Sequence, residues 1–328
     1  MKKALFITDN CENNKEYSIK RKDGEGNNLS AKNEMIDALN KIFDCVYVTY
    51  SVTEACEYIT NNKDAFVITT YYGIAESDSK AIIPSVCKAN NTKYWGADPF
   101  THIICNDKYL SKTYIKHFGL TPVPGVVIYS PDNETEFDEL QNLKFPVIIK
   151  PNFGGGSNGI AKESIKYNFE EAKKYVKELY SYQKMPILIE EYIPGYEISF
   201  VIIGNKNEIL YSNETQLVLD DKSFFNFEIY GLETKKIDKS KKRYIHSNLI
   251  DKINKEQMIK LFQSFDKAEF MRIDCRIDKN SKLYIMELSP DCSVASSGMF
   301  YSAIKDLGIT YNEMIKILID NSMNNQNY

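Results

Sequence analysis

The chain is poor in histidine and lacks paired cysteines. Its three histidines, His102, His117 and His246, are not spaced for metal ligation and lie near no serine or cysteine motif, which argues against a histidine-based triad. The seven cysteines include no C-x-x-C pair, so neither a zinc site nor a dithiol redox centre is indicated. We expect reduced cysteines that pack as small hydrophobic side chains.

The chain also lacks a long hydrophobic run and an excess of basic residues. No segment approaches the roughly 20 apolar residues of a membrane span, and the apolar stretch after Met1-Lys2-Lys3 is too short for a signal-peptide core. A net charge of −4 provides no basic field for nucleic acid or for an acidic membrane surface. We therefore expect a cytoplasmic protein that binds neither nucleic acid nor membranes.

Hydrophobic sequence is sufficient for more than one core. At 328 residues, 43% of them hydrophobic, the chain suits two or three soluble domains. In residues 1–98, predicted strands at 3–8, 45–50, 65–70 and 93–96 alternate with predicted helices at 53–60 and 79–89 and with a helix capped by Ser30. This alternation predicts an α/β domain with a parallel sheet and helices on both faces, ending near Asp98-Pro99.

The remainder is predicted to form two further parts, 99–185 and 186–328. In the first we expect helices at 106–118, 132–142 and 169–182, and strands at 126–129, 146–149 and 160–162. In the second we expect strands at 187–193, 198–203, 208–212, 270–278 and 282–288, a helix at 254–267 and two final helices. The polar stretch from Asp220 to Arg243 is expected to be a long loop and a candidate lid.

A glycine-rich loop follows the predicted strand at 146–149. That strand ends on Lys150, and glycines stand at 154, 155, 156 and 159. Without Cβ atoms the backbone amides can close on an anion, so the lysine and the loop suggest a nucleoside triphosphate site. The literal match Gly154-x-Gly156-x-x-Gly159 is not a dinucleotide fingerprint, because it lies mid-chain and leads into a predicted strand. No Gly-Lys-Ser/Thr follows, and the lysine precedes the glycines, so P-loop and kinase patterns do not fit either.

Two acidic residues stand in consecutive predicted strands. Asp274 follows Arg272 in Arg-Ile-Asp, and Glu287 precedes Ser289 in Glu-Leu-Ser. Strand alternation places each of these pairs on one face. If the two strands are neighbours, Asp274 and Glu287 can share Mg²⁺, which takes carboxylate and phosphate oxygens. The alternative is a pair of solvated carboxylates at a strand edge.

At this point the sequence resembles the ATP-grasp superfamily and, within it, the D-alanine–D-alanine ligases. The resemblance runs from about residue 106 to 308 and rests on four motifs in the family's order. These are Asp107-Lys108 followed by Gly-Leu-x-Pro, Pro-Val-Ile-Ile-Lys150-Pro with Gly-Ser-x-Gly, Ile-Glu190-Glu191-Tyr-Ile193-x-Gly-x-Glu197, and Arg272-x-Asp274 with Glu287-x-Ser289-Pro. It implies a three-domain ATP-grasp architecture, α/β at the N-terminus and α+β in the ATP-grasp part.

The resemblance also implies an ADP-forming carboxylate–amine ligase that works through an acyl phosphate. Its catalytic residues would be Arg272 at the oxyanion, with Ser157 and Lys150 at the phosphoryl group. Its metal, Mg²⁺ or Mn²⁺ by the family pattern, would be held by Asp274, Glu287 and either Ser289 or Asp291. The expected ATP-binding residues are Lys108, Lys150, Gly155, Gly156, Ser157, Glu190 for the adenine amine, the backbone of Glu191, Tyr192 and Ile193 for the ring edge, and Glu197 for the ribose.

The departures from the family concern the substrates. Thr8-Asp9-Asn10-Cys11 replaces a Gly-Gly-x-Ser-x-Glu run, and simple alignment puts Asn14 at its glutamate, with Glu12 and Glu16 nearby. Gly156 replaces a serine, Ser289 an asparagine and Gly298-Met299 a Ser-Leu pair, while the lid motif at 224–231 lacks its lysine and final tyrosine. We expect small-molecule carboxylate and amine substrates, an amino acid or small peptide other than D-alanine, and by family analogy a homodimer. The alternatives are a non-catalytic nucleotide-binding protein derived from a ligase, and an enzyme that phosphorylates a carboxylate or hydroxyl without ligation.

Overall fold

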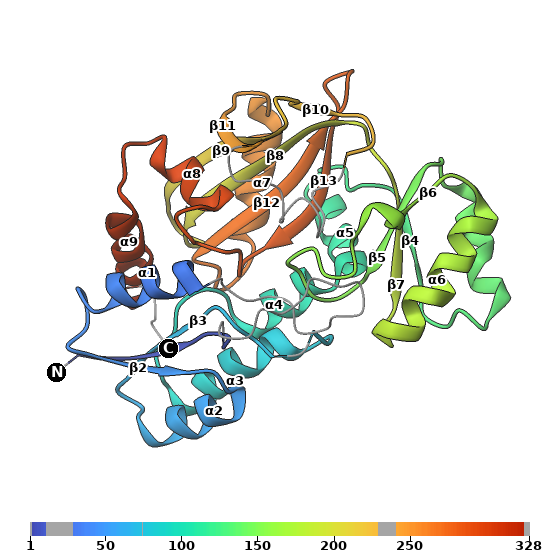
Figure 1. The fold of residues 1–328 in the computed structure, drawn as a ribbon. Helices are drawn as coiled ribbons and strands as arrows, with labels where there is room; N and C mark the ends of the chain where they lie inside the picture. The colour runs from blue at the N-terminus through green and yellow to red at the C-terminus, as the bar shows by residue number, and fades with distance from the viewer. Residues whose placement is uncertain (1, 11–28, 74, 229–240, 325–328) are drawn as a thin grey trace.

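Three sheets organise the chain (Figure 1). The computed structural model describes residues 2–10, 29–73, 75–228 and 241–324. Figure 1 shows the N-terminal sheet in blue, a small sheet in green and the largest sheet in yellow to orange. In the part of the chain so described, no helix is both long and apolar enough to cross a membrane.

The N-terminal sheet is parallel, as predicted. β1 (Lys3–Ile7) lies between β2 (Cys45–Thr49) and β3 (Phe66–Thr69). Alternate residues of β1 point to opposite faces: Ala4 and Phe6 pack with α1 (Leu29–Leu39), and Leu5 and Ile7 pack with α2 (Val52–Asn61) and α3 (Ile82–Asn90). Helices therefore cover both faces of this sheet.

Three details of the N-terminal prediction are wrong. The expected strand at 93–96 is reduced to one parallel bridge between Tyr94 and Val67. Ser30 is the second residue of α1 and not its cap. The helix at 79–89 is split into η1 (Ser79–Ala81) and α3, with Pro84 in the first turn of α3, where the missing N–H of a proline does no harm.

The second sheet is antiparallel, in the order β4-β7-β5-β6. Before it come α4 (Pro99–Asn106), which the sequence did not lead us to expect, and α5 (Lys108–His117). The strands are β4 (Gly125–Ile128), β5 (Val147–Pro151), β6 (Ile165–Lys166) and β7 (Ile187–Glu191), and α6 (Phe169–Gln183) packs against them. β7 thus pairs with β4 and β5, although it lies beyond the expected boundary at 185/186.

Two predicted elements of this part are also wrong. The segment expected to be an α-helix at 132–142 is a 3₁₀ helix, η2 (Glu134–Asn142). The return strand of the hairpin is β6 and not 160–162, and a short 3₁₀ turn, η3 (Lys162–Ser164), precedes it. The glycine loop delays the strand because its backbone takes positive φ angles at Gly154, Gly156, Ser157 and Gly159, which are incompatible with extended chain.

The third sheet has the order β11-β9-β8-β12-β13, with β10 paired to β8. Its strands are β8 (Gly195–Gly204), β9 (Ile209–Leu219), β10 (Phe224–Phe225), β11 (Lys242–His246), β12 (Phe270–Ile277) and β13 (Leu283–Ser289). α7 (Lys252–Gln263) packs on one face, and α8 (Met299–Lys305) and α9 (Tyr311–Asn324) pack on the other. The expected loop at 220–243 therefore contains strand residues, since buried Phe225 pairs with Gly195; residues 229–240 lie outside the described part.

Candidate active site

A cavity of about 630 Å³ brings together residues from all three parts of the chain. The N-terminal domain contributes Thr69, Thr70 and Lys80, and the loop after β13 contributes Asp291 and Cys292. The predicted site residues in its lining are Lys108, Lys150, Gly155, Gly156, Ser157, Glu190, Tyr192, Ile193, Glu197, Arg272, Asp274, Glu287 and Ser289. Glu191 is not among them; its carboxylate accepts from the backbone N–H of Lys144 at 3.0 Å.

The two carboxylates expected to share a metal face each other across neighbouring strands. β12 and β13 are antiparallel, with Asp274 opposite Glu287 and Arg272 opposite Ser289. Directly opposite residues point to the same face of a sheet, so all four lie on one side. The intervening residues Ile273 and Leu288 point into the hydrophobic core, which fixes the register.

A bulge in β13 brings an extra side chain to the cavity. The register shifts between Asp274 and Cys275, so that Cys275 pairs with Ile285 and Met286 has no partner of its own. Met286 and Glu287 therefore both line the cavity although they are consecutive. The bulge therefore places an apolar and an acidic side chain of one strand side by side in the cavity wall.

Arg272 and Asp274 form a bidentate ion pair. The guanidinium Nε and Nη2 donate to the two carboxylate oxygens, each at 2.8 Å. Burial opposes the positive charge, but the Asp274 carboxylate outweighs it and raises the pKa of Arg272 above its ordinary value. Ser199, a residue without a local sequence signal, donates its hydroxyl to Asp274 Oδ1 at 2.5 Å. Asp274 is thus held in one orientation from two sides.

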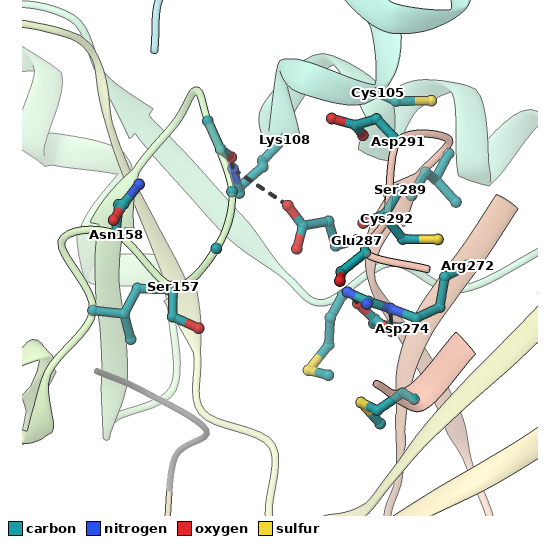
Figure 2. Close-up of a pocket in the computed structure, with 18 of the residues that line it drawn as sticks. Cys105, Lys108, Ser157, Asn158, Arg272, Asp274, Glu287, Ser289, Asp291 and Cys292 are labelled. Atoms are coloured by element: carbon teal, nitrogen blue, oxygen red, sulfur yellow. Dashed lines mark hydrogen bonds and ion pairs between the residues drawn. The ribbon is translucent and has the colours of Figure 1, made fainter. Parts of the chain in front are cut away.

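Lys108 reaches Glu287 from the opposite wall, as Figure 2 shows. Its ammonium lies 3.4 Å from Glu287 Oε1 and donates to the carbonyl of Gly154. Asp107 caps α5 and so places Lys108 in the first turn of this helix. Asn152, at the end of β5, donates to Asp107 Oδ1 at 2.8 Å. The glycine loop and the start of α5 are therefore tied together.

Glu190 lies buried between two lysines. Lys150 is 2.5 Å from Glu190 Oε2, and Lys112 pairs with Oε1. Burial favours the neutral acid, but the two lysines outweigh it and lower the pKa of Glu190; the pKa of Lys150 is raised, because its acidic neighbours outweigh burial. Burial and the neighbouring Lys150 lower the pKa of Lys112. The three groups together carry one net positive charge.

Lys112 was missed at the level of sequence. It stands four residues after Lys108, and this spacing puts both lysines on one face of a helix, which was a usable signal. Because both oxygens of Glu190 already accept from lysines, its role toward an adenine amine stays a prediction.

The glycine loop takes a backbone conformation that requires glycine, with positive φ angles at Gly154, Gly156 and Gly159. A Cβ on Gly159 would come within 2.6 Å of the Pro151 ring, so only glycine fits there. The N–H of Gly154 donates to Asn106 Oδ1 at 2.9 Å, which anchors the start of the loop. Asn158, not singled out from the sequence, lines the cavity, and neither atom of its buried side-chain amide has a hydrogen-bond partner in the described chain.

Within the described chain, hydrogen bonds already occupy two of the three backbone N–H groups that were expected at the adenine edge. The N–H groups of Glu191 and Tyr192 are already bonded, to the carbonyls of Pro124 and Pro146. Of the three backbone positions expected to meet an adenine edge, this leaves the N–H of Ile193. Glu197, expected at the ribose, is buried and accepts from Arg276 at 2.8 Å.

Asp291, the alternative metal ligand, is engaged elsewhere. It forms a 2.7 Å ion pair with Lys80 of η1, and both side chains are almost fully buried. Despite burial, Lys80 and the neighbouring His102 lower the pKa of Asp291. Ser289 therefore remains the predicted neutral oxygen ligand of the metal. At the predicted substrate positions, Gly298 caps α8 and Met299 is buried. Asn14, Glu12, Glu16 and the lid positions 229–231 lie outside the described residues.

His102, which neighbours the Lys80–Asp291 pair, should make the protein acid-sensitive. Complete burial lowers its pKa from 6.5 to about 4. The unfolded chain therefore binds a proton near pH 6.5 that the folded protein binds only near pH 4, so stability falls as the pH drops through this window. We expect a loss of about 3 kcal/mol over this range. Urea denaturation followed by Trp95 fluorescence should show a flatter pH profile for His102→Phe. Equal losses in both proteins would refute this role.

Comparison with known proteins places the chain in a family. Arg272, Asp274, Glu287 and Ser289 lie on one face of two neighbouring strands. Beside them is a glycine loop that follows a lysine and lies between two antiparallel sheets. Together these features define an ATP-grasp protein. The family model described as "D-ala D-ala ligase C-terminus" matches residues 115–320. The chain belongs to the D-alanine–D-alanine ligase family.

Individual relatives agree with this assignment. The chain is 24% identical over 297 residues to D-alanine–D-alanine ligase A of Bacillus cereus, covering 90% of this chain and 93% of that ligase. It is 28% identical over 231 residues to D-alanine–D-alanine ligase of Wigglesworthia glossinidia brevipalpis, covering 70% of this chain but only 63% of that ligase.

Solved structures show the same fold. The crystal structure of D-alanine–D-alanine ligase from Bacillus anthracis complexed with ATP matches with a TM-score of 0.72 at 19% identity, over 98% of this chain and 97% of that one. VanG D-Ala:D-Ser ligase from Enterococcus faecalis matches with a TM-score of 0.70 at 16% identity, over 98% and 99%. The predicted fold class, α/β with an N-terminal parallel sheet and α+β in the ATP-grasp part, is confirmed, and the two sheets beyond the N-terminal one are antiparallel.

Proposed function

We propose that this protein is an ATP-dependent carboxylate–amine ligase that forms an amide or peptide bond through an acyl phosphate. The observation that carries the proposal is the facing pair Asp274 and Glu287, with Arg272 on the same side of the sheet and Lys108 and Lys150 on the opposite wall. Family membership and the names of the relatives support the same chemistry.

The cavity fits a nucleoside triphosphate. The net positive charge of the Lys112–Glu190–Lys150 group suits polyphosphate, and a buried unpaired amide on Asn158 suits a ligand oxygen. Its volume lies in the range of small-molecule sites. We infer that Lys108 and Lys150 bind phosphate oxygens and that the loop amides from Gly155 to Ser157 hold the transferring phosphoryl group.

The facing carboxylates fit Mg²⁺ or Mn²⁺, although the protein alone does not complete the site. Within residues 2–10, 29–73, 75–228 and 241–324, no cluster of three or more His, Cys, Asp or Glu side chains is placed to hold a metal. Mg²⁺ in nucleotide sites is commonly held by one or two carboxylates together with phosphate oxygens, as Asp274 and Glu287 would allow. A bound ion would neutralise phosphate charge during transfer. When the metal and the nucleotide bind, the ion pair between Glu287 and Lys108 would break. Glu287 would then bind the metal, and Lys108 would bind a phosphate oxygen.

The remaining chemistry falls to Arg272 and to the exclusion of water from the cavity. Arg272 presents a fixed guanidinium beside Asp274, where it would stabilise the oxyanion formed when the amine attacks the acyl phosphate. Acyl phosphates hydrolyse, so a site that excludes water protects the intermediate. We propose an amino acid or a small peptide other than D-alanine as the substrate. The support is Gly298-Met299 at the end of the cavity, where the resemblance places a Ser-Leu pair.

Hydroxylamine tests this function without knowledge of the second substrate, because it traps acyl phosphates as hydroxamates. The protein, ATP and Mg²⁺ would be incubated with hydroxylamine and pools of amino acids of both configurations and of small peptides. We expect hydroxamate and ADP to form together with at least one pool. ATP turnover that never yields hydroxamate, with any pool, would contradict a carboxylate-activating ligase.

A non-catalytic nucleotide-binding protein is the second candidate. The observation that favours it is Ser289, a weak neutral ligand where the resemblance implies an asparagine. The intact set of Lys150, Asp274 and Glu287 in one cavity weighs against it. The two candidates differ in turnover, which a pure binding protein lacks with every pool.

A further inference from the structure

Arg276 extends the row of functional side chains on β12. Arg272, Asp274 and Arg276 alternate along this strand, and all three line the cavity. The residues between them, Ile273 and Cys275, belong to the core. Arg276 stands directly opposite Glu197 of β8, so the two side chains share a face. The alternation in Arg-Ile-Asp-Cys-Arg is a sequence signal for Arg276, but the motif Arg272-x-Asp274 does not include this residue.

The guanidinium of Arg276 joins the three segments around the predicted nucleotide site. Its Nη2 donates to Glu197 Oε2 at 2.8 Å and to the carbonyl of Glu228 at 3.2 Å. Its Nη1 donates to the carbonyl of Ile193 at 2.9 Å and to the hydroxyl of Tyr192 at 3.0 Å. The rings of Tyr192 and Phe225 lie 5.1 and 5.5 Å from its central carbon.

The contacts with Arg276 set the orientation of the Glu197 carboxylate toward a ligand. Arg276 is buried and holds one carboxylate oxygen, Oε2, while Oε1 has no hydrogen bond within the described chain. Arg276 also holds the carbonyl of Ile193, the residue whose N–H is left for an adenine edge. An arginine can fix both groups at once because its donors form a rigid planar fork.

We propose that Arg276 is a positioning residue that sets ribonucleotide specificity: it orients Glu197 so that Oε1 accepts hydrogen bonds from the ribose hydroxyls. This inference rests on the proposed function, because it takes the nucleotide to bind along residues 190–197. Arg276 touches no reacting atom, and its effect reaches the nucleotide through Glu197 and Ile193. Its loss should therefore change the choice of sugar more than the chemistry of ligation.

The test compares the dissociation constants of ATP, 2′-deoxyATP and 3′-deoxyATP by calorimetry, with Mg²⁺ present and no other substrate. The wild-type protein should prefer ATP over at least one deoxynucleotide by about tenfold or more, the scale of a hydrogen bond to a charged group. Arg276→Met should reduce this preference to within about threefold, and Arg276→Lys should fall between. Lys206→Met, which removes an exposed lysine paired with Asp266, should leave it unchanged.

Each outcome decides a different point. If the wild-type protein binds no ATP, the proposed function fails before the inference is reached. If it binds ATP but does not discriminate, or if Arg276→Met weakens all three nucleotides by the same factor, Arg276 is only structural and the inference is wrong. Circular dichroism checks the fold of each variant, and if Arg276→Met does not fold, Arg276→Lys decides by the same criterion.

Discussion

Replacing Glu287 with glutamine is expected to lower the turnover number by about 10³-fold while the protein stays folded. Glutamine keeps the shape of the side chain but removes its negative charge. Glu287 stands opposite Asp274, and these two carboxylates are proposed to hold the metal. Loss of that charge should forfeit on the order of 4 kcal/mol of transition-state stabilisation. The side chain is 28% exposed, so its neutralisation should disturb the fold little. The measurement is amide- or hydroxamate-coupled ADP release under saturating substrates.

Nucleotide binding gives a second readout for the same variant. Lys108 loses its carboxylate partner, so metal-free ATP should bind Glu287→Gln at least as tightly as the wild type, while the gain from added Mg²⁺ should vanish. Glu208→Gln, an exposed neutralisation between β8 and β9, serves as the matched control and should behave as the wild type. Wild-type turnover in Glu287→Gln would rule out a metal-binding role for this residue.

Glu190→Gln should be the most destabilising charge removal in the site. It removes the carboxylate that pairs with both buried lysines, Lys112 and Lys150, and breaking a buried ion pair in this way typically costs about 3–5 kcal/mol. Urea denaturation should show a loss of that size in the free energy of unfolding. A loss below about 1 kcal/mol would mean that the two lysines do not depend on Glu190 as their shared counter-charge.

Lys150→Met is the matched contrast. It leaves Glu190 paired with Lys112 in a neutral pair, so the free energy of unfolding should be unchanged or higher. Its affinity for ATP should nevertheless fall, because the net positive charge of the group is gone. The two variants thus separate the structural task of Glu190 from the binding task of Lys150. Equal destabilisation by both would contradict this division.

The sequence predicted the architecture where periodicity was clear. Alternating strands and helices indicated the parallel sheet, and the alternation in Arg272-Ile-Asp274 and Glu287-Leu-Ser289 led to a facing pair that the register confirms. The failures are local. The strand expected at 160–162 lies in a segment controlled by left-handed backbone at 154–159, and η2 is a 3₁₀ helix although its pattern suggested an α-helix.

The pairing of charges within the cavity was not predictable in the same way. Lys112 and Glu190 are 78 residues apart in the chain, and Arg276 and Glu197 are 79 apart. Such contacts depend on how helices and strands that are distant in the sequence come together, and no spacing rule connects them. Spacing did offer a hint for two residues. Lys112 lies one helical turn after Lys108, and Arg276 lies two residues after Asp274 on the same face of its strand. Lys80, Ser199 and Asn158 carried no local signal of this kind.

The most direct test of the proposed chemistry follows an oxygen atom. Amino acids and small peptides labelled with ¹⁸O in their carboxylates would be incubated with the protein, ATP, Mg²⁺ and hydroxylamine, and the released phosphate analysed by mass spectrometry. Attack of the carboxylate on the γ-phosphoryl group forms an acyl phosphate, and displacement by the amine leaves one carboxylate oxygen on the phosphate. We therefore expect ¹⁸O in the phosphate in step with hydroxamate formation. Unlabelled phosphate from a protein that turns over ATP would contradict an acyl-phosphate ligase.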